Sequence, residues 1–216
     1  MSCCSHCAAN ASQSDPKRAE KDRARYQRKG PDPTTKLILE QLRPITRPGD
    51  TLLDVGGGIG VIGLELQTSG LREIVLVDAA PSSLSVAETL FANTGSSAQF
   101  RAVSGDFAEL SAPLTADIVT LDRVVCCYVD YVALLTRAAA SARRTLALSF
   151  PRERWFVRLR VAAENLGRRI TGNAFRTFVH PPAAMTALLR DVGFRHIGRR
   201  TTPGWCVDHW ERSPSV

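Results

Sequence analysis

The sequence predicts an α/β domain with an open, mostly parallel sheet that is covered by helices on both faces. Three observations lead to this fold class. Short apolar runs alternate with helical segments, and each strand-helix unit takes roughly 20–30 residues. A glycine-rich turn at residues 56–60 follows the first apolar run. The 216 residues are also enough for one well-packed domain, and a second domain is not expected.

Each element follows from its local pattern. Buried parallel strands are expected at the apolar runs TLLDVG, EIVLVDA, AQFRAVSGD, ADIVTLD and RRTLALSF, which are residues 51–56, 73–79, 98–106, 116–122 and 143–150. Helices are expected at 34–45, 61–70, 81–95, 128–142 and 181–193. The helix at 81–95 shows the signals most clearly, because Pro81 opens its first turn and Gly95 ends it. Residues 194–202 and 204–213 read as an antiparallel pair of strands at one edge of the sheet.

The chain divides into two parts. Residues 1–35 are expected to form a flexible, cysteine-containing tail followed by a basic arm, in which residues 17–30 make a charged helix. Residues 36–216 form the α/β domain. Within it, residues 151–182 interrupt the alternation with a long basic, amphipathic segment, which we interpret as a substrate flap.

The charge balance narrows the class of partner. The formal net charge of +7 and the isoelectric point near 9.4 suggest an anionic small molecule, a nucleic acid or a membrane surface, although an arginine-rich proteome also raises the isoelectric point. No apolar run approaches the ~18–20 residues that a membrane span needs. The first residues lack the pattern of a secretory signal, so a cytoplasmic location with six reduced cysteines is expected.

The most informative motif is LLDVGGGIG, at the end of the first predicted strand. Glycines at that position allow a tight turn and let a ligand lie against bare backbone. The second predicted strand ends in Asp78, where a carboxylate can bind a ribose diol, and the third ends in GDF with Asp106. A nicotinamide-binding fold would show G-x-G-x-x-G without the leading aspartate.

The pattern D-x-G-x-G-x-G with Asp78 and GDF resembles the class I S-adenosylmethionine-dependent methyltransferases over residues 36–216. The resemblance implies a Rossmann-like sheet of seven strands, in which the last hairpin reverses one strand. It also implies S-adenosylmethionine as the cofactor, with Asp78 on the ribose and Asp106 and Phe107 near the adenine. The implied cofactor-binding residues are Asp54, Gly56, Gly57, Gly58, Gly60, Asp78, Ala79, Asp106, Phe107 and Asp122.

Within that family the sequence is similar to the magnesium-protoporphyrin IX O-methyltransferases, in the arm RKGPDPTT, the strand end LDRVVCCY and the segment LALSFPRERW. This similarity implies O-methylation of a carboxylate on a flat, apolar, anionic acceptor. An ionised acceptor needs no general base, whereas an alcohol or amine does. The catalytic candidates are Asp122, Cys127, Tyr128 and His180, and the substrate-binding candidates are Tyr26, Arg123, Tyr131, Arg152, Trp155 and Arg176. Those enzymes carry a histidine where this chain has Cys127.

The cysteines support a second hypothesis, S-methylation of a small thiol, sulfide or a metalloid such as arsenite. CCSHC places Cys3, Cys4, His6 and Cys7 close together in a spacing that can share a metal, although no metal is assigned. A nucleic-acid acceptor is disfavoured, because LDRV stands where base methyltransferases carry an Asn-Pro-Pro-Tyr type of motif. A protein that keeps the fold for binding only, and the oligomeric state, are left open.

Overall fold

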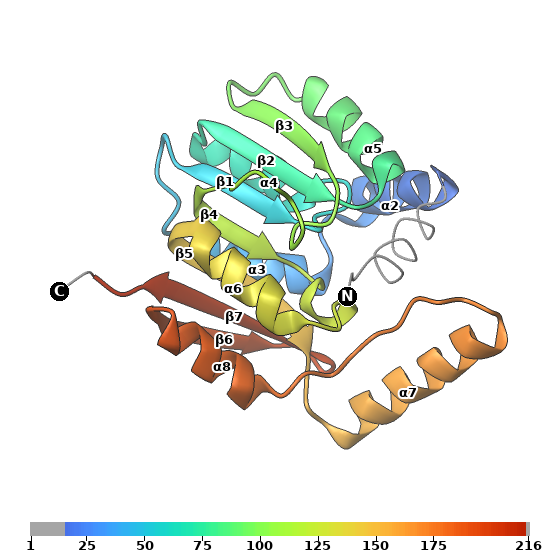
Figure 1. The fold of residues 1–216 in the computed structure, drawn as a ribbon. Coiled ribbons are helices and arrows are strands. Elements are labelled where there is room, and N and C mark those ends of the chain that lie inside the picture. The colour runs from blue at the N-terminus through green and yellow to red at the C-terminus, as the bar shows by residue number, and fades with distance from the viewer. Residues whose placement is uncertain (1–15, 215–216) are drawn as a thin grey trace.

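A seven-stranded sheet with the order β3-β2-β1-β4-β5-β7-β6 runs through residues 16–214, the part of the chain that this computed structural model describes (Figure 1). Strands β1 to β5 are parallel, and β7 lies antiparallel between β5 and β6. The predicted fold class and the single reversed strand are confirmed. The strands are β1 Thr51–Val55, β2 Glu73–Asp78, β3 Gln99–Ser104, β4 Ala116–Leu121, β5 Ala142–Pro151, β6 Phe194–Thr201 and β7 Trp205–Arg212.

Helices cover both faces of this sheet because neighbouring strand residues point to opposite sides. Leu52 packs with helices α3, α4 and α5, whereas Leu53 packs with α6 and α8 on the other face. No helix within residues 16–214 has both the length and the apolar character to span a bilayer. The helices are α2 Pro16–Lys29, α3 Pro33–Leu42, α4 Val61–Leu66, α5 Pro81–Ala92, α6 Tyr131–Ser141, α7 Trp155–Ile170 and α8 Pro182–Asp191, with short 3-10 turns η1 Gln67–Ser69 and η2 Val125–Cys127.

Two segments differ in detail from the sequence expectation. The helix expected from residue 128 starts at Tyr131, because Asp130 caps it by accepting from the backbone N–H of Ala133 at 2.9 Å. The basic segment after β5 is a helix only as far as Ile170. Residues 171–181 return toward the sheet without regular structure, and Figure 1 shows α7 extending away from the rest of the domain.

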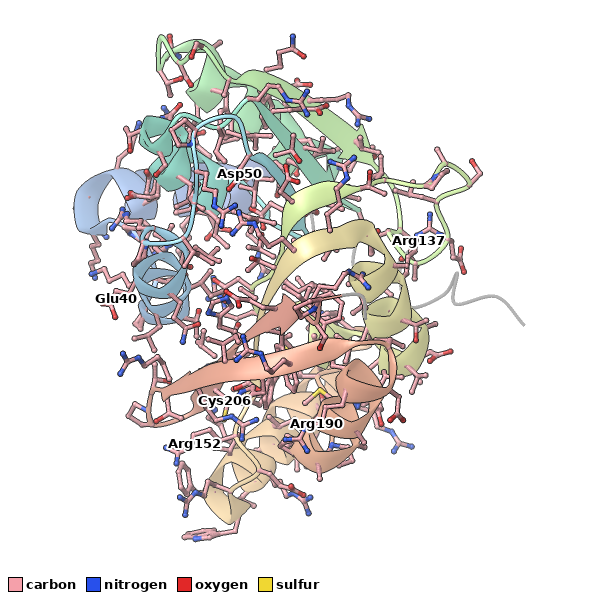
Figure 2. All side chains as sticks on the ribbon, turned by 90° about the vertical axis from the view of Figure 1, so that its left-hand side faces the viewer. Glu40, Asp50, Arg137, Arg152, Arg190 and Cys206 are labelled. Atoms are coloured by element: carbon pink, nitrogen blue, oxygen red, sulfur yellow. The ribbon has the colours of Figure 1, made fainter. Side chains whose placement is uncertain are left out.

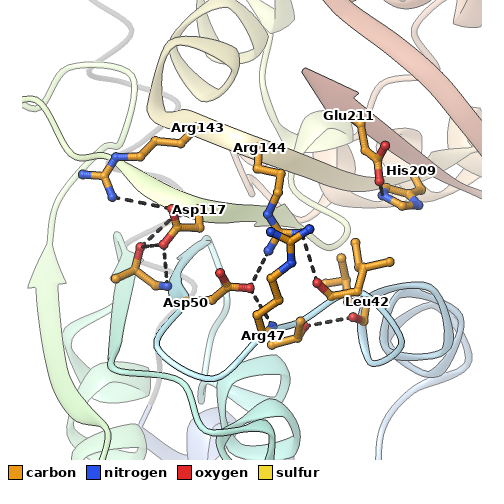
Figure 3. Close-up of polar contacts among 11 residues, drawn as sticks. Leu42, Arg47, Asp50, Asp117, Arg143, Arg144, His209 and Glu211 are labelled. Carbon is orange, nitrogen blue, oxygen red and sulfur yellow. Dashed lines mark hydrogen bonds and ion pairs between the residues drawn. The ribbon is translucent and has the colours of Figure 1, made fainter. Parts of the chain in front are cut away.

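A polar network joins the amino ends of the central strands, at the edge opposite the glycine-rich loop (Figure 3). The backbone N–H and the hydroxyl of Thr51 donate to Asp117 Oδ2 at 2.9 and 2.8 Å. Asp50 accepts from Arg144 and from the backbone N–H of Arg47 (Figures 2 and 3). These contacts tie β1 to β4 and β5 without taking part in the site described below.

Candidate functional site

The site lies where the order of strands reverses. β1 pairs with β2 on one side and with β4 on the other, so the loops after β1 and β4 diverge and leave a crevice at the carboxyl edge. The glycine-rich loop, residues 56–60, occupies the β1 side of the crevice, and η2 occupies the β4 side. The sheet topology therefore opens a crevice at the carboxyl edge, where the glycine-rich motif predicts a ligand.

Asp54 supports the loop from below. It is 1% exposed, and its Oδ1 accepts from the Thr120 hydroxyl at 2.7 Å, while its Oδ2 has no hydrogen-bond partner among the described residues. Burial raises the pKa of Asp54 from 3.8 to about 7, with smaller contributions from the Asp122 and Asp78 charges. A Cβ at Gly57 would overlap this carboxylate and lie 2.7 Å from Leu76 Cδ1. Glycine at residue 57 thus lets the loop close over a buried, under-satisfied carboxylate.

Asp78 is held against the same loop from the end of β2. Its Oδ2 accepts from the backbone N–H of Gly58 and its Oδ1 from that of Ala80, both at 2.8 Å. Burial raises the pKa of Asp78, and the two backbone hydrogen bonds oppose that rise. The arrangement fixes the carboxylate beside the loop, and both Asp78 and Ala79 line a cavity there.

Two adjoining cavities open above the loop, with volumes of about 260 and about 430 Å³. The smaller one reaches Asp78, Phe107 and Tyr128. The larger one reaches Asp54 and Asp122. The amino-terminal arm and the flap both contribute residues to the walls of the two cavities. The residues that line both cavities are Arg18, Asp22, Gly56, Gly58, Arg123, Cys127 and Phe175.

These cavities fit the parts of S-adenosylmethionine. The fixed carboxylate of Asp78 suits a diol, and the wall contributed by Phe107 suits a flat ring. The unpartnered Oδ2 of Asp54 lies beneath backbone that carries no Cβ, where it can attract a positively charged group. The predicted role of Asp106 is less direct, because its Oδ1 accepts from the Tyr128 hydroxyl and from the backbone N–H of Ala108.

Asp122 is fixed at the end of β4. Its Oδ2 accepts from the Thr35 hydroxyl at 2.6 Å and its Oδ1 from the Ser149 hydroxyl at 2.5 Å. Ser149 also accepts from the backbone N–H of Arg123 at 2.8 Å. With both oxygens engaged, Asp122 is placed to hold the mouth of the crevice in shape.

Arg123 follows in a left-handed conformation, with φ of +62°, which is rare for a residue with a side chain. Its guanidinium pairs with Asp32 at 2.7 Å, which links the strand end to the segment before α3. The turn exposes its carbonyl to two thiols, since Cys126 and Cys127 lie 3.4 and 3.5 Å from it through their Sγ atoms. Arg123 lines both cavities, and its role in binding a substrate stays a prediction.

The two thiols form a pair with Sγ atoms 3.8 Å apart. Cys127 lines both cavities, whereas Cys126 lines only the larger one. The hydrogen bond from Cys126 lowers the pKa of Cys127, and the nearby Arg168, Arg123 and Arg18 lower it further against the effect of burial. The same hydrogen bond and burial raise the pKa of Cys126, so Cys127 ionises first.

His180 and Tyr131 lie outside both cavities. The Nε2–H of His180 donates to the carbonyl of Tyr128 at 2.8 Å, and its ring centroid is 4.4 Å from that of Tyr131. Neither residue lines either cavity, and burial lowers the pKa of His180. His180 is therefore positioned to hold the backbone of Tyr128 rather than to contact an acceptor.

Four other predicted substrate contacts lie away from the cavities. The Tyr26 hydroxyl donates to Glu65 at 3.0 Å, and burial together with that carboxylate raises the pKa of Tyr26 to about 12. Arg152, labelled in Figure 2, donates to the carbonyl of Thr202 at 3.1 Å. Arg176 donates to carbonyls of its own loop, and Trp155 is 76% exposed on α7. The Cys3, Cys4, His6 and Cys7 group lies outside the described residues.

Several side chains of the site were not singled out from the sequence. Arg18 and Asp22 reach both cavities from α2, the helix of the basic arm, and Phe175 reaches them from the flap. Thr35 and Ser149 hold Asp122. The charged pattern of residues 17–30 predicted the helix, but only the packing of Ala19, which is 2% exposed, shows which face turns toward the loop.

Comparisons with known proteins agree with this geometry. The methyltransferase small domain model matches residues 20–121. Ribosomal protein L11 methyltransferase of Pelotomaculum thermopropionicum is 31% identical over 113 residues, which is 52% of this chain and 35% of that protein. Ribosomal protein L11 methyltransferase of Streptococcus uberis is 29% identical over 90 residues, which is 42% of this chain and 28% of that protein. The chain thus spans about a third of the length of these curated relatives.

Solved structures resemble most of the chain. Magnesium protoporphyrin IX methyltransferase from Synechocystis PCC 6803 with bound SAH superposes with a TM-score of 0.65 at 21% identity, covering 83% of this chain and 81% of that one. A Haloferax volcanii methyltransferase in complex with the activator Trm112 gives 0.71 at 16% identity, covering 95% and 99%. Sheet order, glycine-rich loop and these matches together show that the chain has the fold of the class I S-adenosylmethionine-dependent methyltransferases.

Proposed function

We propose that this protein is an enzyme that transfers the methyl group of S-adenosylmethionine to the carboxylate of a small, largely apolar acid. Asp54, Asp78, Phe107 and the loop of residues 56–60 hold the cofactor. The acceptor lies in the larger cavity, between η2 and the inner face of α7. The name of the Synechocystis neighbour, a magnesium protoporphyrin IX methyltransferase, supports a porphyrin-like acid as the first acceptor to test.

One observation carries this proposal: Arg18, Arg123 and Arg168 line the larger cavity together with Cys127, and their charges favour a lower pKa for that thiol. An anionic acceptor atom beside Cys127 would gain from the same three guanidinium groups. Carboxylates of the wall hold two of these arginines in place, since Asp32 pairs with Arg123 and Glu164 lies 3.6 Å from Arg168. The remaining guanidinium N–H groups can bind the acceptor.

The chemistry fits the residues of the walls. Bound S-adenosylmethionine supplies an electrophilic methyl group. A carboxylate oxygen bonds to the methyl carbon while the bond between that carbon and the sulfonium sulfur breaks, and the electron pair stays on sulfur. No proton has to leave a carboxylate, and within residues 16–214 neither cavity is lined by a histidine or lysine that would act as a general base. The protein's part is to align the acceptor and exclude water.

A thiolate acceptor is the second candidate, and the same observation favours it. The arginines that lower the pKa of Cys127 would also lower that of an acceptor thiol placed beside it. The acceptor would then ionise before transfer and give its proton to solvent. The Cys126–Cys127 pair would form the part of the cavity wall that contacts this sulfur-containing acceptor.

The test is methyl transfer from labelled S-adenosylmethionine to a panel of acceptors. The panel holds propionate-bearing porphyrins, small thiols and sulfide, arsenite, ribosomal protein L11, and RNA and duplex DNA. We expect label in a porphyrin product that mild alkali releases as methanol, because esters hydrolyse and thioethers do not. Asp78→Asn should abolish the transfer, whereas Asp117→Asn, at the opposite edge, should leave it unchanged.

The other outcomes are decisive as well. Alkali-stable label on a thiol would establish the second candidate and exclude the first. Label on ribosomal protein L11 or on nucleic acid, with none on the small acids, would refute both. Failure to bind S-adenosylmethionine in a calorimetric titration would refute methyl transfer as such.

A further inference from the structure

The helix α7 turns an apolar stripe outward. Trp155, Leu159, Leu166 and Ile170 are all between 59% and 78% exposed. Their spacing of i, i+4, i+11 and i+15 places them in one line along the helix. Phe156 borders this line, is 45% exposed, and its ring meets that of Trp155 edge to face with centroids 5.9 Å apart. We call these five side chains the α7 stripe.

The inward face of the same helix is already used. Val157 and Val161 are buried, and Arg160, Glu164 and Arg168 line the larger cavity. Asn165 anchors this face by donating to the carbonyl of Thr177 at 2.7 Å. The helix is therefore docked through one side, and its more continuous apolar side faces solvent. A contiguous apolar surface of this kind marks an interaction site.

Positive charge surrounds the α7 stripe. Residues 151–182 contain seven arginines and two glutamates, and no lysine or aspartate. At 100° per residue, Arg158 and Arg169 fall on one side of the stripe and Arg160 on the other. Of these flanking arginines, Arg158 pairs with Glu153 and Arg160 lies 3.5 Å from Glu164. Within residues 16–214 no carboxylate forms an ion pair with Arg154 or Arg169. An apolar stripe with an aromatic end and arginine flanks has the composition of a helix that lies in a membrane interface.

We propose that the α7 stripe docks on an anionic lipid surface. Figure 1 shows α7 standing out from the rest of the domain, so a flat surface can reach it without meeting the sheet. The arginine flanks would lie at the headgroups while Trp155, Leu159 and Leu166 enter the acyl boundary. A second copy fits less well, because a symmetric contact through the stripe would bring the arginine flanks of both copies together.

The docking has a consequence for the acceptor. Since the inward face of α7 lines the larger cavity, this helix lies between the cavity and the proposed lipid surface. A lipophilic acid could then pass from the bilayer into the site beside α7. This consequence rests on the proposed function, whereas lipid binding itself does not depend on it and is measured separately.

The test is co-flotation of the full chain with vesicles of phosphatidylcholine, with and without phosphatidylglycerol. We expect binding to the anionic vesicles only, and weaker binding as salt rises from about 50 to about 500 mM. The double variant Leu159→Glu, Leu166→Glu should lower the partition coefficient about tenfold or more. The matched control is Ile197→Glu, since Ile197 is an apolar side chain exposed on β6, and its binding should equal that of the parent.

Trp155 provides a second readout. Bromine-labelled lipid should quench its fluorescence on docking. Trp155→Leu should remove most of that quenching while binding persists, because Trp210 is buried in β7 and Trp205 is half-buried against the larger cavity. Unchanged S-adenosylhomocysteine affinity in every variant shows that the site is folded. Equal binding to neutral vesicles, or anionic binding that survives the double variant, overturns the proposal. Absence of vesicle binding also overturns it, and a dimer that the double variant dissociates would then identify a second copy as the occupant.

Discussion

Replacing Asp54 by asparagine separates what this side chain contributes to stability from what it contributes to cofactor binding. The amide oxygen of asparagine can still accept from the Thr120 hydroxyl, so the packing around residue 54 is preserved. The variant loses only the ionisable group, which is 1% exposed and has one oxygen without a partner among the described residues. We therefore expect Asp54→Asn to be more stable than the parent at alkaline pH and to bind S-adenosylmethionine more weakly.

The magnitude follows from the pKa. Burial raises the pKa of Asp54 from 3.8 to about 7, so between these values the folded chain holds a proton that the unfolded chain has lost. The stability of the parent is thus highest below pH 4 or so, falls as pH rises, and levels off above about pH 7. The whole shift corresponds to about 4 kcal/mol, of which about 3 kcal/mol falls between about pH 5 and about pH 8.

The assay is urea unfolding of the parent and Asp54→Asn at several pH values across this range. The difference in unfolding free energy, variant minus parent, should grow by about 3 kcal/mol from about pH 5 to about pH 8. Asp117→Asn is the matched control. Although burial opposes it, hydrogen bonds from Thr51 and the charges of Arg143 and Arg144 lower the pKa of Asp117 from 3.8. Its contribution to stability is therefore constant from about pH 5 to about pH 8 and is lost only in more acidic solution.

Cofactor binding gives the second half of this test. The cationic amino acid portion of S-adenosylmethionine should favour ionised Asp54, so the affinity of the parent should rise with pH up to about 7 and then level off. Asp54→Asn should bind more weakly and lose this pH dependence. A pH-independent stability difference between variant and parent would refute the reasoning, since it would mean that Asp54 is already ionised in the folded chain.

Four further changes test the site. Asp78→Ala should lower the affinity for S-adenosylhomocysteine at least about tenfold in calorimetry, because the carboxylate for the ribose diol is lost. Gly57→Ala should destabilise the domain by about 1–3 kcal/mol in thermal unfolding, since its Cβ lies too close to Leu76 and the carboxylate below. Cys127→Ser should reduce kcat on the true acceptor while the cofactor Kd stays the same, and an unchanged kcat would assign Cys127 to packing. Thr35→Val should cost about 1–3 kcal/mol of unfolding free energy by leaving an oxygen of Asp122 unpaired, whereas Thr35→Ser should restore it.

Local residue patterns are enough to place the sheet and the glycine-rich loop. Apolar runs such as Leu52–Leu53 bury residues on both sides, which suits only a strand covered on two faces, and the alternation with helices then requires parallel crossovers. The run of glycines is equally local in origin. Gly57 cannot carry a Cβ above Asp54, so the position of the loop at the end of β1 is fixed by neighbouring residues.

The side chains that surround the cavities follow from the packing of distant segments. Arg18 reaches them because α2 packs back over the loop, and Asp122 is held by Thr35 and Ser149 from two other elements. His180 carries a reactive ring but is turned to the backbone of Tyr128. The residue pattern of α7 predicts an amphipathic segment. Only the packing shows that the face with Arg160, Glu164 and Arg168 turns toward the larger cavity, and that the α7 stripe faces solvent. Contacts between distant segments are set by how elements pack in three dimensions, and local residue patterns carry no record of that packing.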